Sequence, residues 1–328
     1  MANEPILQVN HLLTQFHSEN GNVNAVNNVS FEIQEGQTVC LVGESGCGKS
    51  ATAMSIMGLI DPTSGQVKSG EVLFNGRDLL NMKKGDLRRA RGNEFAMIFQ
   101  EPMSSLNPVL TIGEQITEPL LEHEVLTKKE AKKKALELIE LVGIGRGPEI
   151  FASYPHQLSG GMLQRIMIAI ALSCNPRLLI ADEPTTALDV TIQAQILDLL
   201  RVLKKERNMS MLLITHDLGV VAEVADYVIV MYAGKIIEQA SVIELFTNPK
   251  HPYTKGLLKA KPVINQRREE LYTIPGQVPN LVDLQPSCYF SERCEHCMRI
   301  CTEKAPPIKQ LDNGHQVACW LYEEEVGV

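Results

Sequence analysis

Short runs of apolar, often β-branched residues alternate with longer segments of helical periodicity through the first 240 residues. The clearest runs are residues 38–42, 97–99, 178–181, 211–215 and 228–231. Because consecutive positions in these runs are apolar, both faces of each strand must be covered. This is typical of a largely parallel sheet flanked by helices. The pattern therefore predicts an α/β fold.

Two stretches depart from this alternation. Residues 31–37 and 72–74, with Asn75-Gly76 directly after them, indicate antiparallel strands and a tight turn. Between Pro108 and Cys174 the periodicity is helical, which predicts a helical insert at about residues 102–175 within the α/β domain.

After residue 241 the prolines recur and regular periodicity fades. We therefore expect a domain at residues 1–240, with the helical insert inside it, and a small loop-rich module at residues 241–328. A module of this size has a small core, so a structural metal would help to hold it together.

The net charge of −8, from 31 basic and 39 acidic residues, argues against nucleic acid as a partner. An acidic chain lacks the basic surface that binds phosphate backbones, so we expect no nucleic acid. The longest wholly apolar stretch, residues 166–172, is far too short to span a bilayer, and no basic-apolar leader opens the sequence. We expect a cytoplasmic protein that meets a membrane only through partners.

Residues 43–50 match the phosphate-loop pattern G-x-x-x-x-G-K-[ST] directly after an apolar strand, with a helix expected from Lys49 or Ser50. Backbone N–H groups of such a loop point at phosphates, Lys49 would neutralise the β- and γ-phosphates, and Ser50 would bind Mg²⁺. The alternative is a Gly-rich turn without ligand. The predicted ATP-binding residues are Gly43, Glu44, Ser45, Gly46, Cys47, Gly48, Lys49, Ser50 and Ala51.

The run at 178–181 continues directly into Asp182 and Glu183. A carboxylate at the end of a buried strand is costly unless a cation or a donor compensates it. We therefore expect Asp182 to lie beside Mg²⁺ and Glu183 to polarise the attacking water. The alternative is an ordinary surface strand end.

A third motif, Leu-Ser-Gly-Gly-Met at residues 158–162, resembles the LSGGQ signature of ATP-binding cassette (ABC) proteins. The other landmarks of that family follow in order, and the resemblance covers about residues 5–245. It implies the ABC nucleotide-binding fold, with a RecA-like parallel sheet core, an antiparallel β subdomain and a helical subdomain. In the family, two cassettes enclose two ATP molecules.

The resemblance implies roles for single residues. Ser159, Gly160 and Gly161 would contact the ATP of the partner subunit, while Met162 departs from the usual Gln and puts the contact of that position in doubt. Gln100 would sense Mg²⁺ and the attacking water and would link the site to the membrane subunits. His216 would hold the γ-phosphate, and Asp189 would couple the two sites of the dimer. Phe16 would stack on adenine. Packing within a sheet is the alternative role of Phe16.

Closer similarity extends beyond the cassette. His-Pro-Tyr-Thr at 251–254, the stretch 274–279 and the terminal cysteines resemble the C-terminal extension of oligopeptide and dipeptide permease ATPases, with nickel importers as close relatives. This implies a motor subunit of a bacterial peptide importer on the cytoplasmic face of the membrane. Its implied partners are a second, different ATPase subunit (with a homodimer in isolation as the alternative), two membrane permeases and, indirectly, an extracytoplasmic peptide-binding protein.

Eight cysteines are present, and five crowd into the last 41 residues with the spacing C-x5-C-x2-C-x3-C and a final Cys319. Four thiolates in a reducing compartment suit either Zn²⁺ or an iron–sulfur cluster. The resemblance implies a [4Fe–4S] cluster on Cys288, Cys294, Cys301 and Cys319 and leaves Cys297 over. Of the others, Cys40 in a strand and Cys174 in a helix are expected as core residues, and Cys47 is expected to make ATP binding sensitive to thiol reagents.

Two other functions fit a cassette ATPase. A soluble cassette of translation usually carries two phosphate loops in one chain, and DNA-maintenance relatives insert a long coiled coil, for which the 110 residues between Lys49 and Ser159 leave no room. A regulatory subunit without turnover would not need Glu183 and His216. An ATP-hydrolysing subunit of a peptide importer is the favoured hypothesis; the alternatives are an importer for nickel or another small solute and a soluble ABC ATPase that is not coupled to transport.

Overall fold

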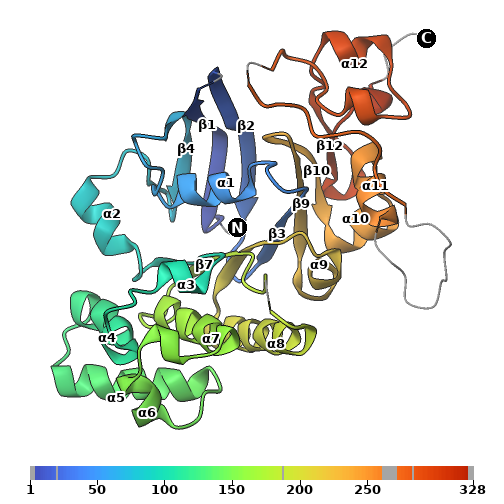
Figure 1. Ribbon diagram of the computed structural model, residues 1–328. Coiled ribbons are helices and arrows are strands. Elements are labelled where there is room, and N and C mark those ends of the chain that lie inside the picture. Colours follow the sequence, from blue (N-terminus) through green and yellow to red (C-terminus); the bar gives the residue numbers. More distant parts are fainter. Residues whose placement is uncertain (1–3, 20, 187, 261–271, 283, 324–328) are drawn as a thin grey trace. The chain divides into compact units, whose positions relative to one another are not determined.

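The computed structural model describes the chain except residues 1–3, 20, 187, 261–271, 283 and 324–328. The chain divides into two compact units (Figure 1). One unit comprises Met1–Ile6, Ile33–Gln37 and Asn81–Ile214, and the other comprises Leu7–Glu32, Thr38–Leu80 and Thr215–Val328. Each unit is described by itself.

The unit built mainly from residues 81–214 contains three parallel strands, β6 (Phe95–Ile98), β7 (Leu178–Asp182) and β8 (Ser210–Ile214), with β7 paired to both neighbours. Every residue of β7 and β8 is buried. The predicted parallel strands are therefore confirmed in this unit. Their apolar residues stand at consecutive positions because both faces of each strand are covered.

The same unit carries the predicted helical region. Two of its helices begin with complete capping boxes, in which Thr111 pairs with Glu114 and Thr127 with Glu130. Cys174 is buried as expected, but it lies beyond the end of the preceding helix at Ala171 and not inside a helix. The helices are α2 (Lys84–Ala90), α3 (Pro102–Ser105), α4 (Ile112–His123), α5 (Lys128–Leu141), α6 (Gly147–Ala152), the 3₁₀ turn η1 (Pro155–Gln157), α7 (Gly160–Ala171) and α8 (Val190–Arg207).

The other unit contains an antiparallel sheet in the order β2-β1-β4-β5, formed by β1 (Leu7–Ser18), β2 (Gly21–Ile33), β4 (Gly65–Phe74) and β5 (Arg77–Asp78). The predicted turn is confirmed: Asn75 and Gly76 join β4 to β5 with φ of 48° and 73°, as a two-residue hairpin requires. The first antiparallel strand was predicted at 31–37, whereas β2 begins at Gly21 and ends at Ile33.

Strand β3 (Thr38–Val42) pairs in parallel with β9 (Tyr227–Tyr232), and β9 pairs with the antiparallel strand β10 (Lys235–Ser241). Helix α1 (Lys49–Ile56) follows β3, and its Ser55 hydroxyl lies 2.7 Å from the Thr14 hydroxyl of β1. Helix α9 (Leu218–Val224) precedes β9.

The C-terminal residues extend this sheet. Short strand β12 (Gln316–Ala318) pairs with β10, and β11 (Ile308–Gln310) pairs with β12. Loops and short helices make up the rest of the described region after Ser241, and the predicted division at residue 240 falls near the end of β10. The short elements are α10 (Val242–Thr247), α11 (Pro252–Lys259), η2 (Ser291–Arg293), α12 (Arg299–Glu303), η3 (Asp312–Gly314) and η4 (Trp320–Tyr322). Among the helices that the structure describes, none has the length and apolar character of a membrane span.

Candidate nucleotide site

Two glycines give the phosphate loop its path between β3 and α1. Gly43 has a φ of 152° and Gly48 a φ of 104°, which side chains rarely tolerate. A Cβ on Gly43 would lie 2.3 Å from the Met231 carbonyl oxygen, and one on Gly48 would lie 2.1 Å from the Ala25 carbonyl oxygen. The loop therefore approaches the backbone of neighbouring segments so closely that only glycine fits at both positions.

Lys49, the first residue of α1, folds back over this loop. Its Nζ donates to the carbonyl oxygens of Gly43 at 2.9 Å and Glu44 at 3.0 Å, and the residue is only 5% exposed. Carbonyl groups do not neutralise an ammonium ion, so a positive charge is held against the loop and is available to an anion. The expected contact of Lys49 with the β- and γ-phosphates stays a prediction.

Cys47 is fully buried in the same loop, with its Sγ 3.8 Å from Lys49 Nζ. Burial raises the pKa of this thiol, although the nearby ammonium group of Lys49 opposes the shift. A buried, protonated thiol is a poor nucleophile. The structure therefore argues against the expected sensitivity of ATP binding to thiol reagents through Cys47.

The remaining residues predicted at this half of the site belong to the same unit. Ser45, Gly46 and Ser50 are exposed, as is His216, which follows β8 in the sequence and precedes α9. Phe16 lies near the end of β1, half-buried against Gly65 of β4. Its expected stacking on adenine stays a prediction.

In the other unit, strand β7 ends at the first of two neighbouring acidic residues. Asp182 is only 4% exposed, and Glu183 follows it with a φ of 45°, an uncommon value for a residue with a side chain. Glu183 Oε2 accepts hydrogen bonds from Gln100 Nε2 at 3.1 Å and from Thr186 Oγ1 at 2.8 Å. The carboxylate is thus oriented by two donors, one of which, Gln100, lies 83 residues away in the sequence. The roles expected for Asp182, Glu183 and Gln100 in hydrolysis stay predictions.

Residues 158–162 also have the predicted local form. Ser159 caps α7 and accepts a hydrogen bond from the Met162 backbone N–H at 3.4 Å, while Ser159 and Gly160 are exposed. An exposed helix N-terminus with small residues is suited to an anion brought by another molecule. Asp189 caps α8 by accepting a hydrogen bond from the Ile192 backbone N–H at 2.9 Å. Its expected role in coupling the two sites of a dimer stays a prediction.

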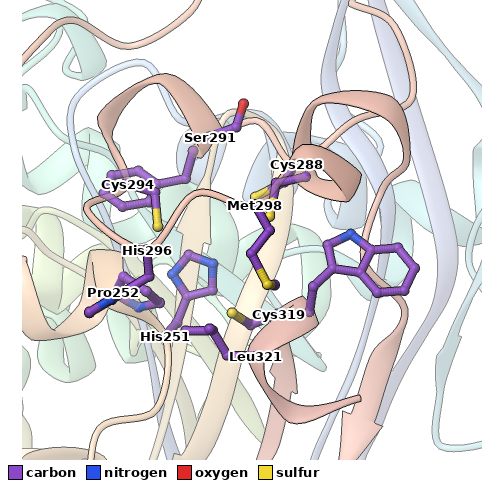
Figure 2. A pocket seen from close by; sticks show the side chains of 12 residues that line it. His251, Pro252, Cys288, Ser291, Cys294, His296, Met298, Cys319 and Leu321 are labelled. Atoms are coloured by element: carbon purple, nitrogen blue, oxygen red, sulfur yellow. The ribbon is translucent and has the colours of Figure 1, made fainter. Parts of the chain in front are cut away.

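The terminal cysteines meet in one place. Cys288, Cys294, Cys301 and Cys319 all line one pocket, of which Figure 2 labels Cys288, Cys294 and Cys319. Cys297 is exposed and is not among the lining residues. Among the described residues, no three His, Cys, Asp or Glu side chains are arranged to hold a single metal ion. The structure thus groups the four predicted thiols without showing a metal-binding module.

Two residues near the phosphate loop were not found from the sequence. Tyr253 and Arg293, both from the C-terminal region, contact Glu44. The only signal was that Tyr253 belongs to the stretch 251–254, which was recognised as a family feature without a physical role.

A phosphate loop with a buried lysine, an oriented carboxylate after a buried strand and a small-residue helix N-terminus define an ABC ATPase. In agreement, residues 26–186 match the family model described as ABC transporter, and residues 237–301 match the one described as oligopeptide/dipeptide transporter, C-terminal region. The chain belongs to the ATP-binding subunits of the oligopeptide/dipeptide ABC transporter family.

Relatives match over nearly the whole length. The chain is 54% identical to the oligopeptide transport ATP-binding protein AppD of Bacillus subtilis (strain 168) over 98% of both chains. It is 49% identical to the dipeptide transport ATP-binding protein DppD of the same organism, over 98% of this chain and 96% of the relative. Among solved structures, the ATP-binding cassette MJ0796, a dimer in a post-hydrolysis state bound to ADP and Pi, matches with a TM-score of 0.65 at 28% identity. That match covers 72% of this chain and 98% of the cassette.

Proposed function

We propose that this chain is the ATP-hydrolysing subunit of a bacterial importer of di- or oligopeptides. The observation that carries the proposal is the carboxylate of Glu183, fixed by Gln100 and Thr186 directly after a buried acidic strand. Similarity to oligopeptide and dipeptide transport subunits over the whole chain, the C-terminal region included, supports peptides as the cargo.

In the proposed reaction, Glu183 accepts a proton from the attacking water as the new oxygen–phosphorus bond forms at the γ-phosphate. The bond from that phosphorus to the β–γ bridging oxygen breaks, which yields ADP and phosphate. Lys49 and His216 would hold the γ-phosphate, and backbone N–H groups of the loop other than that of Glu44, which donates to Tyr253, would hold the β-phosphate. The hydrogen bonds from Gln100 and Thr186 to Oε2 fix the orientation of the carboxylate that takes the proton.

Three residues would hold Mg²⁺. Asp182 is a buried carboxylate at a strand end, and Ser50 and Gln100 offer hydroxyl and amide oxygens, the ligand types that Mg²⁺ prefers. Bound Mg²⁺ would neutralise charge that develops on the phosphate oxygens.

The proposed assembly contains this subunit, a second ATPase subunit and two membrane permeases at the cytoplasmic face. Ser159, Gly160 and Gly161 would close on the ATP of the partner subunit. The dimeric state of the similar cassette MJ0796 supports pairing of two cassettes.

The test is uptake of a labelled tripeptide by vesicles that contain the assembled transporter. Uptake should require internal MgATP and should stop when this subunit carries Glu183→Gln. Transport of nickel but not peptide would replace the cargo, and ATP turnover that no permease stimulates would contradict a transport function.

We also propose that Cys288, Cys294, Cys301 and Cys319 hold a [4Fe–4S] cluster. These four thiols, and not Cys297, line one pocket. Burial first, and then the neighbouring cysteines, raise the pKa of Cys288 to about 12, and the pKa of Cys319 is raised to about 11 for the same reasons. Four thiolates cannot share this pocket without cationic charge, which a cluster supplies together with a cross-link between distant parts of the C-terminal region.

Zinc is the alternative occupant of the four thiols. A single zinc ion would bind all four sulfurs at about 2.3 Å, whereas a four-iron cluster would bind each thiolate at a separate corner. Metal analysis distinguishes the two.

Anaerobically purified protein should therefore be brown and contain about four iron and four sulfide ions per chain. Serine at any of the four positions should remove the colour, whereas Cys297→Ser, the matched control, should keep it. One tightly bound zinc per chain would contradict the cluster and assign the site to zinc. Protein that is metal-free even when prepared without oxygen would contradict both the cluster and the zinc assignment.

A further inference from the structure

The C-terminal region contacts Glu44, the second residue of the phosphate loop, through an ion pair. Arg293 donates to both carboxylate oxygens of Glu44, from Nη1 at 2.9 Å and from Nη2 at 3.1 Å. The side chain of Arg293 is 6% exposed and that of Glu44 is 26% exposed. A two-pronged pair that is largely shielded from water fixes both position and orientation of the carboxylate.

Arg293 is itself held on several sides. Its Nε donates to the Pro275 carbonyl oxygen at 2.8 Å, and Nη1 also donates to the Tyr232 hydroxyl at 3.2 Å. The guanidinium group lies 5.7 Å from the ring centre of Tyr232 and 5.8 Å from that of Phe290. These contacts leave the arginine little freedom to follow Glu44 if the loop moves.

Tyr253 makes a second contact with the same loop residue. Its hydroxyl oxygen accepts a hydrogen bond from the Glu44 backbone N–H at 2.9 Å. The tyrosine is completely buried in α11, and the His251 side chain caps this helix by accepting from the Tyr253 N–H at 3.0 Å. The phenol is therefore a fixed acceptor and not a mobile surface group.

All three polar groups of Glu44 are thus occupied. Tyr253 holds the N–H, Lys49 holds the carbonyl oxygen and Arg293 holds the carboxylate. Lys49 is the residue that faces the phosphates, so the contact of Arg293 with Glu44 reaches the phosphate-binding ammonium group through one shared residue. Without Arg293, an unpaired carboxylate would stand beside the loop that receives a polyanion.

We propose that Arg293 and Tyr253 are positioning residues for the phosphate loop, and that Arg293 neutralises Glu44 so that the loop accepts a nucleoside triphosphate. The inference rests on the proposed function, because it assumes that ATP binds this loop. It gives the C-terminal region a role in ATP affinity in addition to any cluster.

The test compares the full-length chain with Arg293→Ala, Glu44→Gln and the double variant, by titration with a fluorescent ATP analogue and by steady-state turnover. Arg293→Ala should weaken ATP binding about tenfold, within the range of measured couplings between contacting charged residues. KM should rise with it, whereas kcat at saturating ATP should change less than about twofold, since Arg293 does not touch the reacting atoms.

Adding Glu44→Gln to Arg293→Ala should restore affinity to within about threefold of the native chain, because the repelling charge is then gone. Arg299→Ala is the matched control: it removes an exposed arginine paired with Glu303 in the same region and should leave ATP affinity unchanged.

Thermal unfolding of each variant checks the fold, and if Arg293→Ala does not fold, Arg293→Lys decides. Lysine keeps the charge but cannot form the two-pronged pair. Arg293→Lys should therefore weaken ATP binding less than tenfold, and this loss of affinity should disappear when Glu44→Gln is added. Native-like ATP affinity of Arg293→Ala, or no rescue by Glu44→Gln, would overturn the inference. A native chain that binds no ATP would contradict the proposed function and this inference together.

Discussion

Replacing Glu183 by glutamine isolates the chemistry of one carboxylate. Its Oε2 accepts from Gln100 at 3.1 Å and from Thr186 at 2.8 Å. A glutamine oxygen accepts the same two hydrogen bonds and the side chain has the same shape, so the local structure and the strained backbone at φ 45° should persist. What disappears is the ability to take a proton from water.

The size of the loss follows from this difference. General bases contribute roughly 10²–10⁴ to the rate, which corresponds to about 3–5 kcal/mol of activation free energy. We expect turnover to fall by about that factor, while the dissociation constant for ATP changes by less than about threefold, because Glu183 acts on water and not on the bound nucleotide. ATP-bound dimers should therefore accumulate.

Phosphate release by the assembled transporter measures turnover, and titration with a fluorescent ATP analogue measures binding. Thr186→Val is a useful control because it removes one donor but keeps the base. Its turnover should fall about tenfold at most, the scale of one hydrogen bond to a charged group. If Glu183→Gln hydrolysed ATP at a near-native rate, or slowed no more than Thr186→Val, Glu183 would not be the general base.

Three other outcomes follow from the structure. Lys49→Ala should weaken ATP binding by about a hundredfold, the scale of one to two charged hydrogen bonds, whereas His216→Ala should mainly slow turnover; equal binding and turnover in both variants would contradict these roles. Gly48→Ala should abolish ATP binding, because its Cβ would meet the Ala25 carbonyl oxygen at 2.1 Å, and retained binding would show that the loop can relax. Burial lowers the pKa of His251 from 6.5 to about 4, so the unfolded chain takes up a proton between these pH values that the folded chain does not. Stability is therefore fully present above pH 6.5 and should fall by about 3 kcal/mol as the pH drops to 4. Urea unfolding across this pH range should show a flatter dependence in His251→Asn, which keeps a capping side chain; an unchanged slope would assign it to other groups.

The elements that sequence periodicity predicted well are those whose burial is uniform. Strand β3 is buried at every position, and its apolar run leaves no other interpretation. Strand β2 was placed too late because residues 21–30 contain four asparagines, which normally disfavour strands. Only pairing within the sheet stabilises that segment, and pairing is not visible in a local pattern.

In the candidate site, too, the parts that are local in sequence could be predicted and the contacts between distant residues could not. The phosphate loop and the acidic strand end are each contiguous in sequence, so their chemistry could be assigned from spacing alone. The role of Gln100 was predicted only through family resemblance, and its hydrogen bond to Glu183, which spans 83 residues, was not predicted. The contact between Glu44 and Arg293 spans 249 residues and matches no motif, so it required the structure.

The position of Arg293 in the chain connects the two proposals about the C-terminal region. Cys294 follows it directly, and the ring of Phe290 both lines the cysteine pocket and lies against the guanidinium group. A group that fixes the four cysteines would therefore restrict Arg293 as well, and its loss would free the arginine from one side only. The hydrogen bonds to Pro275 and Tyr232 would remain. It follows that removal of the proposed cluster should lower ATP affinity, but by no more than Arg293→Ala does, because that substitution removes the contact through which the pocket reaches the phosphate loop.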